Sequence, residues 1–199
     1  TGKETRLTNN AFSKGNPLWS PDGKYIYHTS FRDGYDLVYR RPSDGSGSEE
    51  LVFRYTPGAF IGLNDISPDG KFLVLESGGI VLVVRLTGDP AMRKGIEFLR
   101  EEAATGVGRL SPDGKFMAFR SDEAKPEQFD VYVRPFNAAK GLPGEAKWRV
   151  STDGVNAMIH WRADSREIFF RGLNLETNEL LVMSADVQTS PRFKTAPPR

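Results

Sequence analysis

The chain has 199 residues, and its 27 Lys+Arg against 26 Asp+Glu give a formal net charge of +1. This balance offers no track for nucleic acid and no patch for an anionic membrane, so we expect neither nucleic-acid binding nor direct membrane insertion. The absence of cysteine excludes disulfides, a thiolate nucleophile and thiolate metal sites. The most apolar stretch, Ile80 to Val84, is too short to span a bilayer.

The first clear local signal is the turn Ser20-Pro21-Asp22-Gly23. Proline presets φ at the second position, aspartate suits the third, and glycine accepts a positive φ at the fourth. The turn is predicted to join a short strand ending at Trp19 to a strand from Lys24 to Ser30, whose residues suit a pleated surface. Two more strands are predicted to complete this unit, Tyr35 to Tyr39 and Glu49 to Arg54.

The same plan recurs three times along the chain. The turn recurs after Ile66 and Leu110, and a degenerate copy follows Trp161. Starting at Trp19, successive copies are 47, 44 and 51 residues apart. The third and fourth strands of these copies are predicted at Ile80–Leu86 and Ile96–Arg100, at Asp130–Pro135 and Lys147–Ser151, and at Glu179–Ser184 and Arg192–Thr195. The best helix candidate, Arg93 to Ala104, is interrupted by Gly95 and is rich in strand-forming residues, so no helix is predicted there.

A period in the mid-forties is what one four-stranded propeller blade requires. The sequence therefore predicts an all-β fold, a β-propeller with four blades of four antiparallel strands. The predicted blades cover residues 15–55, 60–101, 105–152 and 156–199, and residues 1–8 are predicted as the outer strand of a preceding blade. A β-sandwich with coincidental turns is the alternative, and three nearly identical copies disfavour it.

The repeat, an aromatic or apolar residue followed by Ser-Pro-Asp-Gly-Lys and a short apolar strand, resembles the TolB-like, WD-repeat-like propeller family from Thr1 to about Met183. The last two blades are similar to the C-terminal propellers of bacterial receptor-type Ser/Thr kinases, on residues 108–114, 130–136 and 147–152. The resemblance implies a disc of typically six blades around a channel, and a role in protein–protein contact in the bacterial cell envelope.

The chain departs from this pattern in having four recognisable blades, the last without the turn Pro and Gly. Either four blades close on themselves, or the chain is a fragment or processed part of a larger propeller with six or more blades. We favour the larger propeller.

Three polar residues are the candidate ligand-binding positions. Asp65, Arg109 and His160 occupy the same repeat position in successive blades, where the first blade has Leu18. If these positions lie near the channel, the three side chains form a polar cluster on its wall. The alternative is that each lies between two blades and is satisfied locally.

The search for chemistry yields no catalytic residue, cofactor or metal site. His28 lies within a strand, where a packed or surface histidine is expected, and a zinc site needs several convergent ligands. The aspartates of the three turns recur too regularly to be catalytic and are interpreted as turn formers. Trp19 and Trp161 hold the core position of the repeat, so packing is favoured over base stacking, and Trp19→Ala is expected to cost about 3–5 kcal/mol.

The sequence thus predicts a non-catalytic interaction module that binds a protein or peptide, in a periplasmic or extracytoplasmic location. One alternative is a ligand-sensing propeller of a membrane receptor Ser/Thr kinase. Another is the regulatory propeller of a prolyl-oligopeptidase-like hydrolase, although residues 189–199 show no start of a hydrolase domain. A propeller lyase acting on acidic sugars would need more histidines than the two present.

Overall fold

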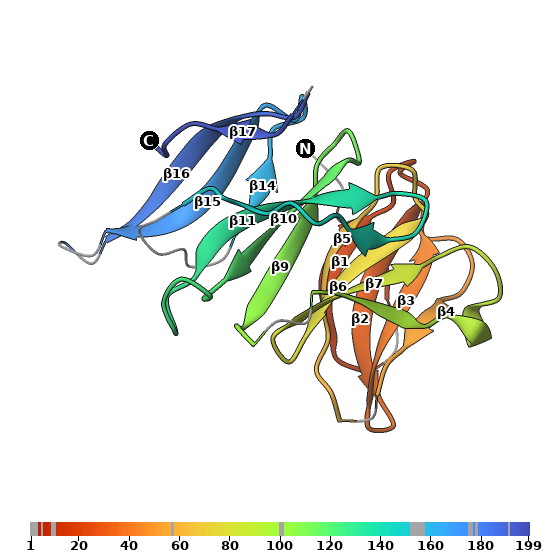
Figure 1. Ribbon diagram of the computed structural model, residues 1–199. Helices are drawn as coiled ribbons and strands as arrows, with labels where there is room; N and C mark the ends of the chain where they lie inside the picture. The colour runs from red at the N-terminus through yellow and green to blue at the C-terminus, as the bar shows by residue number, and fades with distance from the viewer. Residues whose placement is uncertain are drawn as a thin grey trace.

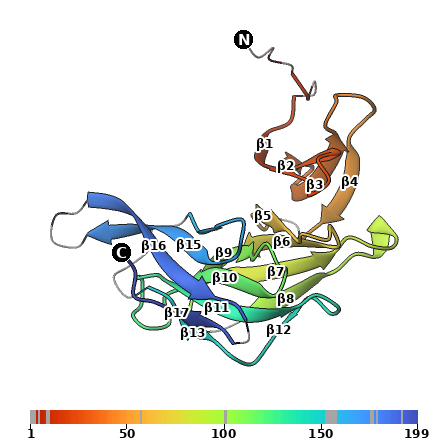
Figure 2. The ribbon, with the colours of Figure 1, turned by 90° about the horizontal axis from the view of Figure 1, so that it is seen from above.

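The computed structural model describes residues 4, 6–8, 11–56, 58–99, 102–151, 158–174, 177, 179–190 and 192–199. These residues form four antiparallel sheets that follow one another in chain order (Figures 1 and 2). The predicted all-β architecture of four-stranded blades is therefore confirmed, and the β-sandwich is excluded.

The first two sheets each have four strands in sequential order. The first contains β1 (Lys14–Trp19), β2 (Tyr25–Arg32), β3 (Tyr35–Pro42) and β4 (Glu50–Arg54); the second contains β5 (Gly62–Ile66), β6 (Phe72–Ser77), β7 (Ile80–Arg85) and β8 (Gly95–Leu99). A short 3-10 helix, η1 (Pro90–Met92), lies between β7 and β8. The sequence prediction did not include η1, although Asp89-Pro90 is a typical helix start, and Asp89 caps η1 by accepting the Ala91 N–H at 2.9 Å.

The last two sheets keep the same plan with shorter outer strands. The third contains β9 (Thr105–Leu110), β10 (Phe116–Ser121), β11 (Asp130–Asn137), β12 (Leu142–Pro143) and β13 (Trp148–Arg149), the last two both pairing with β11. The fourth contains β14 (His160–Trp161), β15 (Glu167–Asn174), β16 (Glu179–Gln188) and β17 (Lys194–Thr195). The strand expected over residues 1–8 falls partly outside the described residues, and Glu4, Arg6, Leu7 and Thr8 form no strand.

The repeated turn is held by its own side chains. In the first copy the Ser20 hydroxyl donates to Asp22 Oδ1 at 2.6 Å and accepts the Tyr25 N–H at 2.9 Å. The Ser20 carbonyl accepts the Gly23 N–H, and Gly23 has a φ of 70°. The second and third copies repeat these bonds through Ser67 and Ser111, so the first three sheets share the same turn between their first two strands.

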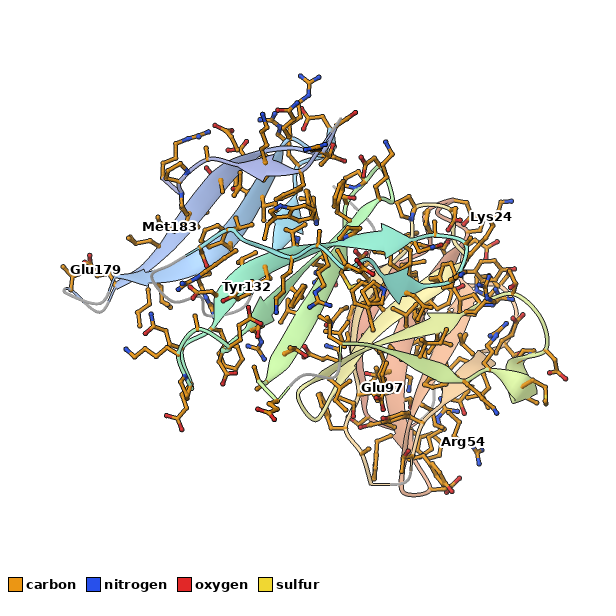
Figure 3. All side chains as sticks on the ribbon, viewed as in Figure 1. Lys24, Arg54, Glu97, Tyr132, Glu179 and Met183 are labelled. Atoms are coloured by element: carbon orange, nitrogen blue, oxygen red, sulfur yellow. The ribbon has the colours of Figure 1, made fainter. Side chains whose placement is uncertain are left out.

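These turns lie together at one end of the sheets, which we call the turn end. Figure 3 shows the arrangement in the first sheet, where Lys24 follows the turn and Arg54 lies at the opposite end.

Each gap between neighbouring sheets is filled by one hydrophobic cluster. The first gap holds Val38 and Leu73, the second holds Val74 and Phe119, and the third holds Val133 and Ile168, all fully buried. The strand register places alternate side chains on opposite faces, so each middle sheet supplies residues to two clusters. The core of the molecule is therefore a row of three inter-blade layers.

The structure corrects the core position expected for Trp19, whose side chain is 63% exposed. Its equivalents Ile66, Leu110 and Trp161 pack in the clusters that join their sheets to the preceding ones. Trp19 faces away from the second sheet, and in the described part of the chain no sheet covers that side. The packing interpretation holds for Trp161 and is wrong for Trp19.

Candidate functional site

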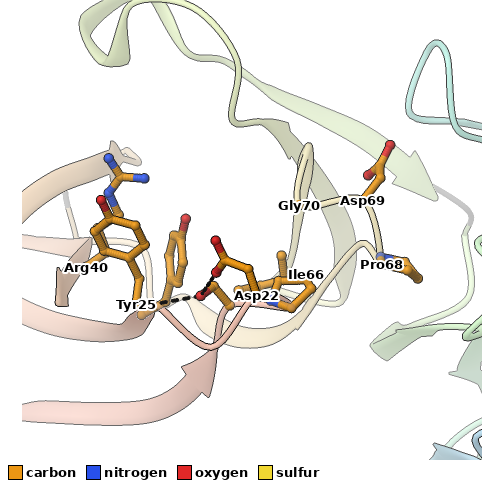
Figure 4. A pocket seen from close by; sticks show the side chains of 10 residues that line it. Asp22, Tyr25, Arg40, Ile66, Pro68, Asp69 and Gly70 are labelled. Atoms are coloured by element: carbon orange, nitrogen blue, oxygen red, sulfur yellow. Dashed lines mark hydrogen bonds between the residues drawn. The ribbon is translucent and has the colours of Figure 1, made fainter. Parts of the chain in front are cut away.

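A pocket of about 440 Å³ opens at the turn end between the first two sheets. Its walls come from the first two Ser-Pro-Asp-Gly turns and from strands β2 and β3 (Figure 4). The lining residues are Ser20, Pro21, Asp22, Tyr25, Tyr27, Arg40, Ile66, Pro68, Asp69 and Gly70. We call this pocket the turn-end groove.

One wall of the turn-end groove is a guanidinium stacked on an aromatic ring. Arg40 lies 4.3 Å from the centroid of the Tyr25 ring and donates to Glu50 Oε2 from Nε at 2.9 Å. Burial alone would lower the pKa of Arg40, but hydrogen bonds to the Tyr27 hydroxyl and to Glu50 outweigh it and raise that pKa. The wall therefore presents a fixed cation beside two tyrosine side chains.

The rim of the groove carries two carboxylates. Asp22 and Asp69 each use Oδ1 to hold their turn, and each places Oδ2 beside a lysine, at 3.8 Å from Lys24 Nζ and 3.0 Å from Lys71 Nζ. The hydrogen bond from Ser20, together with the Lys24 N–H, lowers the pKa of Asp22. Both carboxylates are therefore ionised at neutral pH, each is paired with a lysine, and Figure 4 shows them on the two turns that line the groove.

Among the predicted site residues, the structure brings Asp65 and Arg109 together at the contact between the second and third sheets. Asp65 Oδ2 accepts the Leu110 N–H at 2.7 Å, and Arg109 Nη1 donates to the Asn64 carbonyl. Burial raises the pKa of Asp65, against the opposing effect of its hydrogen bonds and of the Arg109 charge. Both residues thus link two neighbouring blades.

His160 lies near Arg109 on the exposed side of the same row. Its side chain is exposed, and both partial desolvation and the positive charge of Arg109 lower its pKa. The neighbouring Trp161 Nε1 donates to the Arg109 carbonyl at 3.1 Å. The Arg109 Nε is buried and has no hydrogen-bond partner among the described residues. Asp65 and Arg109 thus bond to backbone groups across the contact between two blades, and the charge of Arg109 reaches His160, while a ligand-binding role for the three residues stays a prediction.

His28 is packed, one of the two outcomes that its position in a strand predicted. It is 5% exposed, stacks on Tyr39 and places Nε2 at 3.4 Å from Glu49 Oε1. The described residues contain no group of three or more His, Cys, Asp or Glu side chains that could hold a metal ion. They also contain no helix with the length and hydropathy needed to cross a membrane.

Sequence reasoning missed the turn-end groove. Tyr25 and Tyr27 belong to the strand predicted from Lys24 to Ser30, and Arg40 lies one residue beyond the strand predicted from Tyr35 to Tyr39. The signal that could have found the site is the cross-strand pair Tyr27↔Arg40, because the equivalent pair in the second sheet, Val74↔Val83, is apolar.

Comparison with solved structures decides the fold family. TolB from Acinetobacter baumannii superposes with a TM-score of 0.60 and 19% identity, over 96% of this chain and 53% of that one. A protein assigned as TolB from Agrobacterium tumefaciens gives a TM-score of 0.65 and 22% identity, over 90% of this chain and 60% of that one. This chain has the TolB-like β-propeller fold.

Other propellers share that fold, and the chain spans only part of each relative. Prolyl oligopeptidase B from Galerina marginata, solved with a macrocyclization substrate, matches with a TM-score of 0.63 and 16% identity, over 94% of this chain and 26% of that one. An uncharacterized protein of Agrobacterium fabrum is 40% identical over 52 residues, which are 26% of this chain and 18% of that protein. No protein-family model matches the sequence.

Proposed function

We propose that this TolB-like propeller chain is a non-catalytic interaction module that binds a protein or peptide. The observation that carries the proposal is the turn-end groove, in which two tyrosines, a guanidinium and two carboxylates line a pocket between two rigid sheets. A pocket with apolar walls and a few fixed polar groups is the usual form of a recognition site. Tyrosine and arginine are also the residue types that dominate binding energy at protein interfaces.

The bacterial cell envelope is the proposed location, with a periplasmic or extracytoplasmic partner. This part rests on the resemblance of the repeat to the TolB-like family and is supported by the fold shared with two TolB structures. The proposal assigns no catalytic residue to the chain.

The row from Asp65 to His160 is proposed as a second contact surface for the partner. The exposed imidazole of His160 favours it, since it lies beside the charge of Arg109. In this arrangement Asp65 holds the Leu110 N–H across the contact between two blades, and the partner touches His160.

The proposed function is tested by capturing proteins from a bacterial envelope extract on the immobilised chain. Each captured protein is identified and purified, and its affinity for the chain is measured. We expect Arg40→Ala to weaken the affinity about tenfold or more, because it removes the cation that orders the groove wall. Arg54→Ala is the matched control, since Arg54 stacks on Tyr35 at 4.8 Å in the same sheet but at the opposite end (Figure 3). A chain that binds no partner, yet turns over a substrate, would contradict the proposal.

A further inference from the structure

The other two gaps between sheets show what belongs in the turn-end groove. Tyr25, Phe72 and Phe116 occupy the same position after the turn in successive repeats. Phe72 meets the ring of Phe136 edge-on at 5.6 Å, and Phe116 meets Phe193 at 5.3 Å. In both gaps the covering residue belongs to the next sheet, at or after the end of its third strand.

Backbone packs on this site as well as side chains. Gly141, in the segment that follows β11, lies so close to Phe72 that a Cβ there would be 2.7 Å from the ring and 3.2 Å from Val83. Val83 is the equivalent of Arg40, as its pairing with Val74 shows. The place that the 137–141 segment fills in the second gap is therefore the place that stays open as a pocket in the first.

A guanidinium holds the filling segment in the second gap. Arg85 stacks on Phe72 at 4.6 Å and donates from Nη2 to the Ala139 carbonyl at 2.6 Å. In the first gap, Arg40 stacks on Tyr25 at 4.3 Å. A guanidinium has five N–H groups, so Arg40 can keep its bonds to Glu50 and Tyr27 and still donate to a carbonyl. The first gap thus also offers a stacked guanidinium to such a segment, although it comes from Arg40 at the Val83 position, and the residue equivalent to Arg85 is Pro42.

The corresponding segment of the second sheet takes another path. After β7 the chain forms η1, which packs against β4. Arg93 fixes this path by donating to the Val52 carbonyl at 2.9 Å and to the Leu86 carbonyl at 2.7 Å. Met92 is left 72% exposed, and the space above Tyr25 and Arg40 stays unfilled.

The charge of the rim defines the partner further. Asp22 and Asp69 carry their side chains 53% and 38% exposed beside the opening. A basic side chain next to an apolar one would bind these carboxylates in competition with Lys24 and Lys71 while the apolar group covers Tyr25.

We propose that the turn-end groove receives a turn of a partner protein that imitates the turn formed by residues 137–141, in which the Asn137 carbonyl accepts the Lys140 and Gly141 N–H groups. The turn of the partner places an apolar residue on Tyr25, a backbone carbonyl on the Arg40 guanidinium, and a basic side chain between Asp22 and Asp69. This inference rests on the proposed function and names the class of partner for it.

The probe is a synthetic peptide with the sequence of residues 135–144, Pro-Phe-Asn-Ala-Ala-Lys-Gly-Leu-Pro-Gly, which contains the apolar, basic and glycine residues required. It is titrated into the full chain while amide chemical shifts are followed by NMR. We expect saturable shifts at Tyr25, Tyr27, Arg40 and Ile66. Tyr25→Ala should abolish them, and Tyr35→Ala, at the opposite end of the sheet, should not.

A change in the peptide avoids any effect on folding of the chain. Replacing its lysine, Lys140→Glu in the numbering of the chain, should weaken binding about fivefold through loss of the contact with the rim carboxylates. The inference is overturned if no groove resonance shifts, if the shifts lie elsewhere, or if the lysine replacement has no effect. If Arg40→Ala weakens binding of the partner but the peptide does not bind to the chain, this inference is overturned. The proposed function stands in that case.

Discussion

Equivalent residues of the repeat have different roles because their neighbours differ. Trp19 and Trp161 begin the same turn, yet Trp161 packs in the third-gap cluster and donates to Arg109, whereas Trp19 is exposed. Burial, and not residue type, sets the contribution of an aromatic side chain to stability.

The two tryptophans are therefore expected to respond differently to truncation. Trp161→Ala should lower the free energy of unfolding by about 3 kcal/mol, through loss of packing and of one hydrogen bond. Trp19→Ala should change it by about 0.5 kcal/mol or less, as is usual for exposed positions. Chemical denaturation of both variants measures this, and equal losses would show that Trp19 is covered in solution.

Buried His28 makes stability depend on pH. Burial lowers its pKa below the ordinary value of 6.5, and Arg32 and Lys14 act in the same direction against the Thr29 carbonyl and Glu49. Below about pH 6.5 the unfolded chain binds a proton that folded His28 does not, so stability should fall as the pH falls. The contribution of neutral His28 to stability should be fully present above the pKa of the unfolded state.

Urea denaturation at pH 5 and pH 7.5 tests this effect. We expect the wild-type chain to lose more stability on acidification than His28→Gln, with His160→Gln as the control for the other histidine. Both wild type and His28→Gln contain the same carboxylates, so their common acid sensitivity cancels. Identical pH dependence of these two chains would contradict the assignment.

At the scale of the element, the loop between the third and fourth strands decides whether the turn end of the gap between two sheets is filled. The segment after β11 returns over Phe72, and Gly141 allows this because it combines a φ of 72° with the absence of a Cβ. The segment after β7 has η1 in its place. The sheets themselves are alike, and the loops between their third and fourth strands make the difference.

Gly141→Ala is expected to destabilise the chain by about 2–3 kcal/mol, because it adds a clash with Phe72 to the strain of a positive φ. Gly88→Ala provides the control, since Gly88 has a φ of 85° but nothing within 4 Å of a Cβ. Its cost should be about 1 kcal/mol, from backbone strain alone. Thermal or chemical unfolding gives both values, and equal costs would mean that Gly141 is not packed on the ring.

The sequence was sufficient for the blades because the turn is local. Its hydrogen bonds join residues at most five positions apart, so the turn at Ser67, Asp69 and Gly70 can be predicted from the sequence without knowing which sheet lies beside it. The groove could not be predicted, since it depends on the register that pairs Tyr27 with Arg40 and on the path of a loop in the next sheet. The exposure of Trp19 likewise depends on which sheet lies beside it.

At the scale of the whole molecule, the three clusters in the described part of the chain each join two neighbouring sheets, so the sheets form a row. In such arrays stability is approximately a sum of repeat and interface contributions. Among the described residues the fourth sheet packs on the third through Ile168 and Phe170. It should therefore be the first to open when that interface is weakened.

Ile168→Ala removes a fully buried side chain from the third-gap cluster. We expect hydrogen exchange to accelerate in β15 and β16 while amides of β6 and β7 keep their protection. Val182→Ala, at a position that is 83% exposed, is the control and should leave exchange unchanged. Uniform acceleration over all four sheets would show that the blades unfold as one unit.

The loop that contains η1 leaves the turn-end groove open without changing the sheets, so the residues that form the binding site differ from those that determine the fold. A site is created where a surface connection leaves an aromatic residue uncovered, while the first two sheets keep the same order of four strands. Insertions and deletions in such connections are the changes that evolution tolerates most easily. A propeller with this arrangement can therefore gain, lose or move a binding site through mutations in a single loop. Its binding specificity can change much faster in evolution than its fold.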